Sequence, residues 1–80
     1  MKVYVIQEVV QLASGEFSVH VEVFSAENLQ REKLGEISRQ LAYEGYEYME
    51  DIDDRHLFVD ENGNKYMVYL SEREIIAEIQ

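Results

Sequence analysis

The chain has 80 residues, of which 46% are hydrophobic, and its 17 acidic and 7 basic side chains give a net charge of −10. This length allows a single domain, 1–80, with a small core, and the absence of cysteine excludes disulfide scaffolds and cysteine-ligated zinc. The charge argues against direct nucleic-acid binding, which needs lysine and arginine to displace counterions from phosphates, and it favours a cationic partner.

The first predicted element is a β-hairpin over residues 2–24. Residues 2–12 are rich in valine, isoleucine and tyrosine, as strands prefer, and Ser14-Gly15 supplies a turn. Residues 16–24 alternate between an apolar row and a surface-facing polar row: Phe17, Val19, Val21 and Val23 against Ser18, His20 and Glu22. This alternation predicts a half-buried strand in an antiparallel pair.

The register of this hairpin has two solutions. A two-residue turn pairs Ala13 with Glu16 and places Glu8 opposite Val21 on the apolar side, where an isolated carboxylate is costly. A β-bulge at Gln7-Glu8 instead gathers four apolar residues on one side: Val3, Val5, Val10 and Leu12. We favour the bulge and keep the regular register as the alternative.

A helix is predicted over residues 26–44. Ser25 is typical of an N-cap, and Glu27 lies in the first turn, where the helix dipole favours anions. Gly45 fits the position just after the last turn, and Gly35 predicts close packing of the helix on a sheet. The apolar positions have helical spacing: Ala26, Leu29, Ile37 and Leu41, with Leu34 and Ala42 at the edge.

Three short strands follow at 46–52, 55–60 and 65–70. The Asn62-Gly63 pair between the last two is typical of a two-residue hairpin turn. That turn would place one mainly aromatic set on a single face: His56, Phe58, Met67 and Tyr69. The chain then ends with a capping box starting at Ser71, which predicts a short helix over 72–79.

Together these elements predict an α+β fold of order β-β-α-β-β-β. Its mostly antiparallel sheet is covered on one face by the long helix, with the short C-terminal helix added. If the third strand lay parallel to the first, strand two, helix and strand three would form a right-handed crossover. The order then resembles the ubiquitin-like β-grasp fold over about residues 1–70, although no C-terminal Gly-Gly supports conjugation.

No targeting or catalytic pattern is present in the sequence. The apolar run 3–6 is too short for a signal peptide or a membrane span, which predicts a soluble, cytoplasmic protein. The polar row of the second strand has a spacing of about 6.8 Å, too far for a nucleophile and its base. A calcium loop counted from Asp51 has His56 where glycine is required. We therefore expect no enzyme activity, no metal and no cofactor.

Two surfaces are candidates for binding. The first is acidic: Glu44, Glu47, Glu50, Asp51, Asp53, Asp54, Asp60 and Glu61. It is either a solvated surface or a row of carboxylates that imitates nucleic-acid phosphates in a lysine- and arginine-lined groove. The second is the His56, Phe58, Met67 and Tyr69 set with Tyr46 and Tyr48, which forms either an interface or a second core under the terminal helix. Apolar residues on the far side of the first hairpin, Val5 and Val9, also allow a homodimer.

A compact acidic chain with this element order, no cysteine and an acidic stretch over 44–54 resembles the small phage-encoded inhibitors of host CRISPR–Cas complexes. The resemblance covers the whole chain in size, charge and element order, and it carries over no functional residue. It implies an anti-CRISPR-like, stoichiometric inhibitor that engages a basic, nucleic-acid-handling protein as a nucleic-acid mimic. The alternative is a small structural or self-assembling module, such as an antitoxin-like or accessory subunit, that acts through dimerisation.

Overall fold

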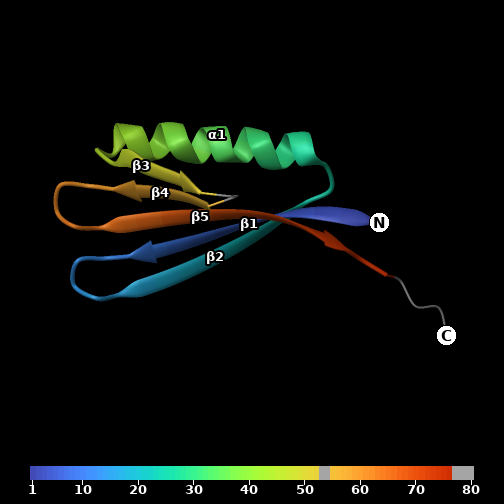
Figure 1. The fold of residues 1–80 in the computed structure, drawn as a ribbon, viewed down its shortest axis with the longest axis horizontal. Helices are drawn as coiled ribbons and strands as arrows, with labels where there is room; N and C mark the ends of the chain where they lie inside the picture. The colour runs from blue at the N-terminus through green and yellow to red at the C-terminus, as the bar shows by residue number, and fades with distance from the viewer. Residues whose placement is uncertain (53–54, 77–80) are drawn as a thin grey trace.

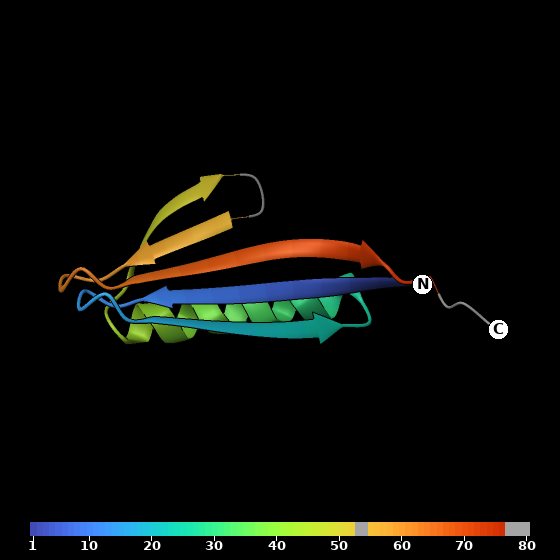
Figure 2. The same cartoon turned by 90° about the horizontal axis from the view of Figure 1, so that it is seen from below.

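The computed structural model describes residues 1–52 and 55–76, which form one five-stranded antiparallel sheet and one helix (Figure 1). The elements are β1 (Lys2–Gln11), β2 (Phe17–Phe24), α1 (Glu27–Tyr43), β3 (Glu47–Ile52), β4 (Arg55–Val59) and β5 (Lys65–Glu74). Figure 2 views the sheet from the side opposite α1, and the helix lies behind it. The predicted α+β class, with one helix on an antiparallel sheet, is confirmed.

The strands lie in the order β2-β1-β5-β4-β3, and each neighbouring pair is antiparallel. β2 and β3 therefore run parallel to each other at opposite edges, and α1 connects them across the three strands between. The β-grasp alternative is wrong, because the neighbours of β1 in the described sheet are β2 and β5, and β3 lies at the far edge.

The final strand continues into the segment where the sequence predicts a helix over 72–79. The last residues of β5 pair with the first residues of β1, and the backbone N–H of Ile75 donates to the carbonyl of Met1 at 2.7 Å. A two-turn helix has too few hydrogen bonds to offset its nucleation, whereas these residues extend an existing ladder. The predicted helix is therefore wrong over residues 72–76, and residues 77–80 lie outside the described part of the chain.

Both β-hairpins close with three-residue turns rather than the predicted two-residue turns. In the first, the N–H of Leu12 donates to the carbonyl of Glu16 at 2.9 Å. In the second, the N–H of Asp60 donates to the carbonyl of Asn64 at 3.1 Å. The last turn residue of each is a glycine in the left-handed region, as three-residue hairpin turns require: Gly15 at φ 97° and Gly63 at φ 85°.

The extra turn residue shifts each pairing by one position, and a shift of one turns every side chain to the other face. Val19 lies opposite Val9 rather than Val10, and the β1–β2 pairing continues without a bulge at Gln7-Glu8. The apolar row of β2 therefore faces away from α1 and its polar row faces toward it, the reverse of the prediction. We call the side of the sheet away from α1 the open face; its β2 residues are Phe17, Val19, Val21 and Val23.

The core lies between α1 and the sheet. Its buried residues are Ile6, Ile37, Leu41, Phe58, Val68 and Leu70. Gln30 of α1 is also buried, and its Nε2 donates to the carbonyls of Val5 at 2.9 Å and Ser71 at 3.1 Å. An amide therefore fixes the first half of α1 to the sheet, while Leu29, predicted on the apolar stripe, is 42% exposed.

The two ends of α1 differ in how well the sequence predicts them. The N-cap is Ala26 in an extended conformation without a side-chain hydrogen bond, one residue later than predicted. The C-terminus is as predicted, because the N–H groups of Gly45 and Tyr46 donate to carbonyls of the last turn in a Schellman motif. Gly35 lacks the predicted close contact with the sheet, since a Cβ there would meet only Nη1 of Arg39, at 3.4 Å.

Candidate functional site

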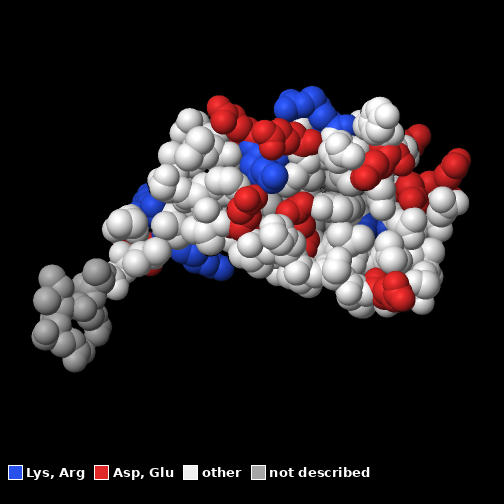
Figure 3. Space-filling model, turned by 180° about the vertical axis from the view of Figure 1, so that it is seen from behind, with Lys and Arg blue, Asp and Glu red and all other residues white. Residues whose placement is uncertain are grey.

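Four of the predicted acidic surface residues gather at the end of the molecule where α1 finishes and the β4–β5 turn lies. We call this group the acidic end; its members are Glu44, Glu47, Asp60 and Glu61. Three of them line a shallow hollow of about 170 Å³ beside Gly45: Glu47, Asp60 and Glu61. Figure 3, which views the molecule from behind, shows acidic side chains toward this end, at the right of the picture.

The electrostatic field of the acidic end acts on Tyr46, which follows Gly45. Burial raises the pKa of the Tyr46 hydroxyl, and the carboxylates of Asp60 and Glu44 raise it further. The ring also packs edge-on against Tyr66, with centroids 6.1 Å apart. Asp60 and Glu44, which are far apart in the sequence, therefore act on the same part of the surface.

Asp60 also builds the β4–β5 turn. Its Oδ1 accepts hydrogen bonds from the backbone N–H groups of Asn62 and Asn64, both at 2.9 Å, and its Oδ2 accepts one from the Asn64 amide at 2.8 Å. Desolvation raises the pKa of Asp60, but the hydrogen bonds from Asn64, Asn62 and Gly63 outweigh it and lower this pKa. Asn64 Oδ1 in turn accepts from the N–H of Ala13 at 2.9 Å, which holds the two hairpin turns together.

The other predicted acidic residues fall outside the described side chains. Glu50 and Asp51 belong to β3, whose backbone pairs them with Leu57 and His56 of β4. Asp53 and Asp54 lie outside the described residues altogether. The acidic end therefore consists of the four members that the structure places.

The predicted aromatic surface is divided between the two sides of the sheet, because the three-residue turn shifts the β4–β5 register. Phe58 faces α1 and is only 3% exposed, so it belongs to the core. His56 lies on the same side and its Nδ1 hydrogen bonds with the Tyr48 hydroxyl at 3.0 Å. Met67 and Tyr69 lie on the open face, where the Tyr69 hydroxyl contacts Met67 Sδ at 3.7 Å. The prediction that these four residues share one face of the sheet is therefore wrong.

A larger groove of about 510 Å³ lies between α1 and the polar row of β2. Most of its polar lining is ionisable: Glu8, His20 and Glu22 from the strands, and Lys33, Glu36 and Glu44 from α1 and its C-cap. Glu8 is 8% exposed and accepts a hydrogen bond from the Tyr66 hydroxyl. This groove is not predictable from a two-residue turn, which places the polar row of β2 on the solvent side.

The chemistry of this groove suits the binding of a cationic or hydrogen-bond-donating group. Burial raises the pKa of Tyr66 and its hydrogen bond to Glu8 raises it further, so the hydroxyl stays protonated at neutral pH and acts as a donor. Glu22 Oε2 is buried and accepts no hydrogen bond from the described residues. The groove therefore presents acceptors rather than an activated nucleophile.

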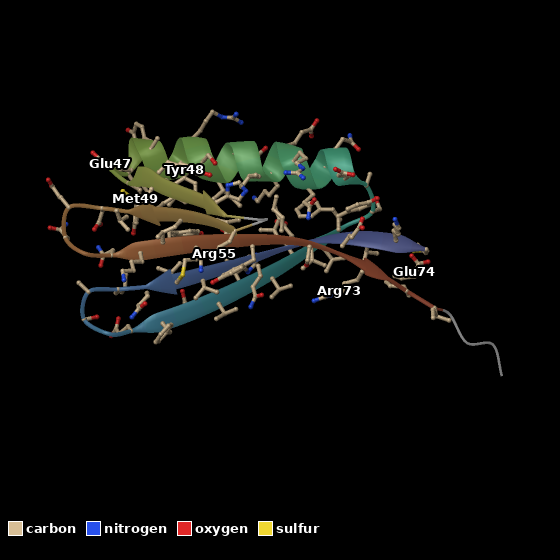
Figure 4. All side chains as sticks on the ribbon, in the orientation of Figure 1. Glu47, Tyr48, Met49, Arg55, Arg73 and Glu74 are labelled. Atoms are coloured by element: carbon tan, nitrogen blue, oxygen red, sulfur yellow. The ribbon has the colours of Figure 1, made fainter. Side chains whose placement is uncertain are left out.

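Charged side chains divide unequally between the two sides of the sheet. On the open face, the described charged residues of the strands are Arg55, Lys65, Arg73 and Glu47. Figure 4 shows Arg73 below β5, away from α1, and Glu47 on β3 near the end of α1. The α1 side and the turns carry the other described acidic side chains, including four on α1 and its C-cap: Glu27, Glu32, Glu36 and Glu44.

Comparison of the chain with family models, with curated proteins and with solved structures found no match. Across residues 1–52 and 55–76, no helix is long and apolar enough to cross a membrane. Within the same ranges, no three histidine, aspartate or glutamate side chains are grouped as metal ligands. The function is therefore inferred from the surfaces of the molecule.

Proposed function

We propose that the protein is a non-enzymatic binding protein that engages a basic surface of a protein partner through its acidic end. The observation that carries this proposal is the unequal division of charge. In the described structure Glu44, Glu47 and Glu61 are exposed, and none of them forms an ion pair with lysine or arginine. Like charges in a cluster destabilise the compact state, so their accumulation at one end supports a binding role.

The proposed partner handles nucleic acid, and the proposed action is stoichiometric inhibition by mimicry of a nucleic-acid strand. Such a partner holds phosphates in a groove lined by lysine and arginine, and a group of carboxylates satisfies the same cations. Association would be accelerated by electrostatic steering and would weaken as the salt concentration rises. The size and acidity that the chain shares with phage-encoded CRISPR–Cas inhibitors support this class of partner.

Capture from a cell lysate, followed by binding measurements with the purified partner, tests this proposal. The informative variant is Glu47→Lys with Glu61→Lys, and the control is Glu27→Lys with Glu32→Lys, which changes the net charge equally at the other end of α1. We expect the first variant to lose affinity and salt dependence and the control to keep both. The partner's own nucleic acid should also displace the protein.

Two results would contradict the proposal. One is unchanged affinity and an unchanged salt slope for the Glu47→Lys, Glu61→Lys variant, which would show that the acidic end makes no contact. The other is simultaneous binding of nucleic acid and this protein to the same site on the partner. A second candidate function, a self-assembling module, is favoured by a different observation, the apolar open face.

A further inference from the structure

The open face exposes an apolar row that nothing in the described structure covers. Phe17 is 66% exposed, and Val19, Val21 and Val23 are 54–59% exposed, although the strand that carries them is fully paired with β1 along one edge. Their alternation with polar residues is that of a strand with one buried face, yet α1 covers the opposite side. A second layer is therefore missing from this side of the sheet.

The apolar surface continues across the neighbouring strands. Val9 lies opposite Val19 and Val5 lies opposite Val23 on β1, while Met67 of β5 lies opposite Val9 on its other side. These side chains share the open face because they occupy directly paired positions. The exposed row of β2 thus continues into apolar residues of β1 and β5, although Gln7 of β1 lies between Val5 and Val9 on the same face.

The size of the open face reaches the lower end of what a stable dimer needs. Five strands spaced about 4.8 Å apart span roughly 24 Å, and the eight residues of β2 extend roughly 26 Å. One chain therefore contributes an area of at most roughly 600 Å², and two chains together contribute roughly 1,200 Å². This total is the lower limit for specific, stable interfaces.

The charge distribution permits two chains of net charge −10 to approach through this face. The only described acidic side chain of the strands on the open face is Glu47, on the edge strand β3. Lys65 and Arg73 lie at the two ends of β5, so these basic residues lie at the margin, while the centre is mainly apolar and contains one polar side chain, Gln7. A mainly apolar centre with a charged rim is the usual anatomy of a protein interface. Of the acidic end, only Glu47 lies on this face, at its β3 edge, while Glu44, Asp60, Glu61 and α1 remain outside such an interface.

We infer that two copies of this chain dimerise by packing their open faces against each other as a two-layered β-sandwich. The two sheets would lie about 10 Å apart, with the β2 valines and Phe17 buried between them. The helices of both copies, with the acidic side chains of the α1 side and the turns, would face outward and remain free for a partner. This inference does not depend on the proposed inhibitory function.

Oligomeric state in solution tests the inference. We expect light scattering and sedimentation of the wild-type protein at micromolar concentrations to give the mass of two 9.4 kDa chains. The variant Val19→Lys, Val21→Lys should have the mass of one chain and an unchanged far-ultraviolet circular dichroism spectrum. The matched control Ser18→Lys, His20→Lys places the same charges on exposed positions of the same strand, on the α1 side, and should stay dimeric.

A second measurement covers the case in which the valine variant does not fold. The unfolding temperature of a dimer rises with protein concentration, and that of a monomer does not. In a mixed sample of labelled and unlabelled wild-type chains, contacts between copies should appear at the methyl groups of Val19, Val21 and Val23. A monomeric wild-type mass, larger open-ended assemblies, or equal dissociation by both lysine variants would each overturn the inference. Equal dissociation would indicate pairing through the β2 edge instead.

Discussion

Replacing Tyr66 with phenylalanine tests whether the buried carboxylate of Glu8 depends on one donor from β5. Glu8 is 8% exposed and accepts a hydrogen bond from the Tyr66 hydroxyl. Phenylalanine keeps the ring and its contact with the core and removes only the donor. A hydrogen bond to a charged group contributes about 1.5–3 kcal/mol, so we expect the free energy of unfolding to fall by about 2 kcal/mol.

Urea unfolding followed by circular dichroism, at one fixed protein concentration, measures this loss. In thermal unfolding the same loss corresponds to a decrease of about 8–16 °C for a chain of this length. Tyr69→Phe is the matched control, because among the described residues the one hydrogen bond of the Tyr69 hydroxyl goes to Met67 Sδ on the open face, at 3.7 Å. We expect that control to change the free energy of unfolding by less than about 0.5 kcal/mol.

A Glu8→Gln background isolates the role of the charge. A hydrogen bond between neutral groups contributes about 0.5–1.5 kcal/mol, so Tyr66→Phe should cost about 1 kcal/mol in that background. If Tyr66→Phe costs no more than Tyr69→Phe in the wild-type background, the Tyr66 hydroxyl does not stabilise the Glu8 carboxylate. The α1 side of the sheet would then tolerate the Glu8 carboxylate without a donor from β5.

Three further predictions concern stability. Gly35→Ala should raise the free energy of unfolding by about 1 kcal/mol, measured in urea, because a Cβ there meets only the flexible end of Arg39; a loss would mean that α1 packs closely at Gly35. Gln30→Leu should cost about 1–3 kcal/mol by the same measurement, because two strand carbonyls lose their shared donor; a cost near zero would show that water replaces the amide. Folding raises the pKa of Tyr66, so the protonated hydroxyl contributes its full stabilisation below the pKa of about 10 that tyrosine has in the unfolded chain. This stabilisation is lost as the pH rises above that pKa. The stability difference between wild type and Tyr66→Phe should therefore narrow in alkaline urea titrations, and a constant difference would contradict the raised pKa.

The elements of this fold are predictable from local patterns, whereas the faces of its strands are not. The end of α1 is predicted by the helical spacing of apolar residues up to Leu41 and by Gly45. The position of β2 is predicted by the alternation from Phe17 to Val23. Both hairpin turns contain a glycine that suits either a two-residue or a three-residue turn. The choice depends on pairing along the whole strand, and an error of one residue reverses every face.

The buried carboxylate of Glu8 shows why burial is harder to predict than alternation. Its donor, Tyr66, lies 58 residues away on the strand that fills the place beside β1. The sequence alone favours a bulge that would remove Glu8 from the apolar side, because no local donor is visible. The same long-range pairing converts the capping box after Ser71 into the end of β5.

The acidic end was partly predictable because its members are exposed residues of one charge. The sequence identifies Glu44 and Glu47 as one stretch and Asp60 and Glu61 as its continuation. Their meeting at one end requires that α1 finishes beside the β4–β5 turn, which is a property of the topology. The apolar row of β2, in contrast, is predicted to be buried, because an apolar row on a strand is usually buried.

The register of the β1–β2 hairpin determines which row of β2 faces outward, and nuclear Overhauser effects measure it directly. The bond from Leu12 N–H to Glu16 makes these residues a hydrogen-bonded pair, so Val9 and Val19 form a non-hydrogen-bonded pair with Cα atoms about 4.5 Å apart. We predict a strong Hα–Hα signal between Val9 and Val19. A signal between Val10 and Val19 instead would show a two-residue turn, place the valine row against α1, and contradict the open apolar face.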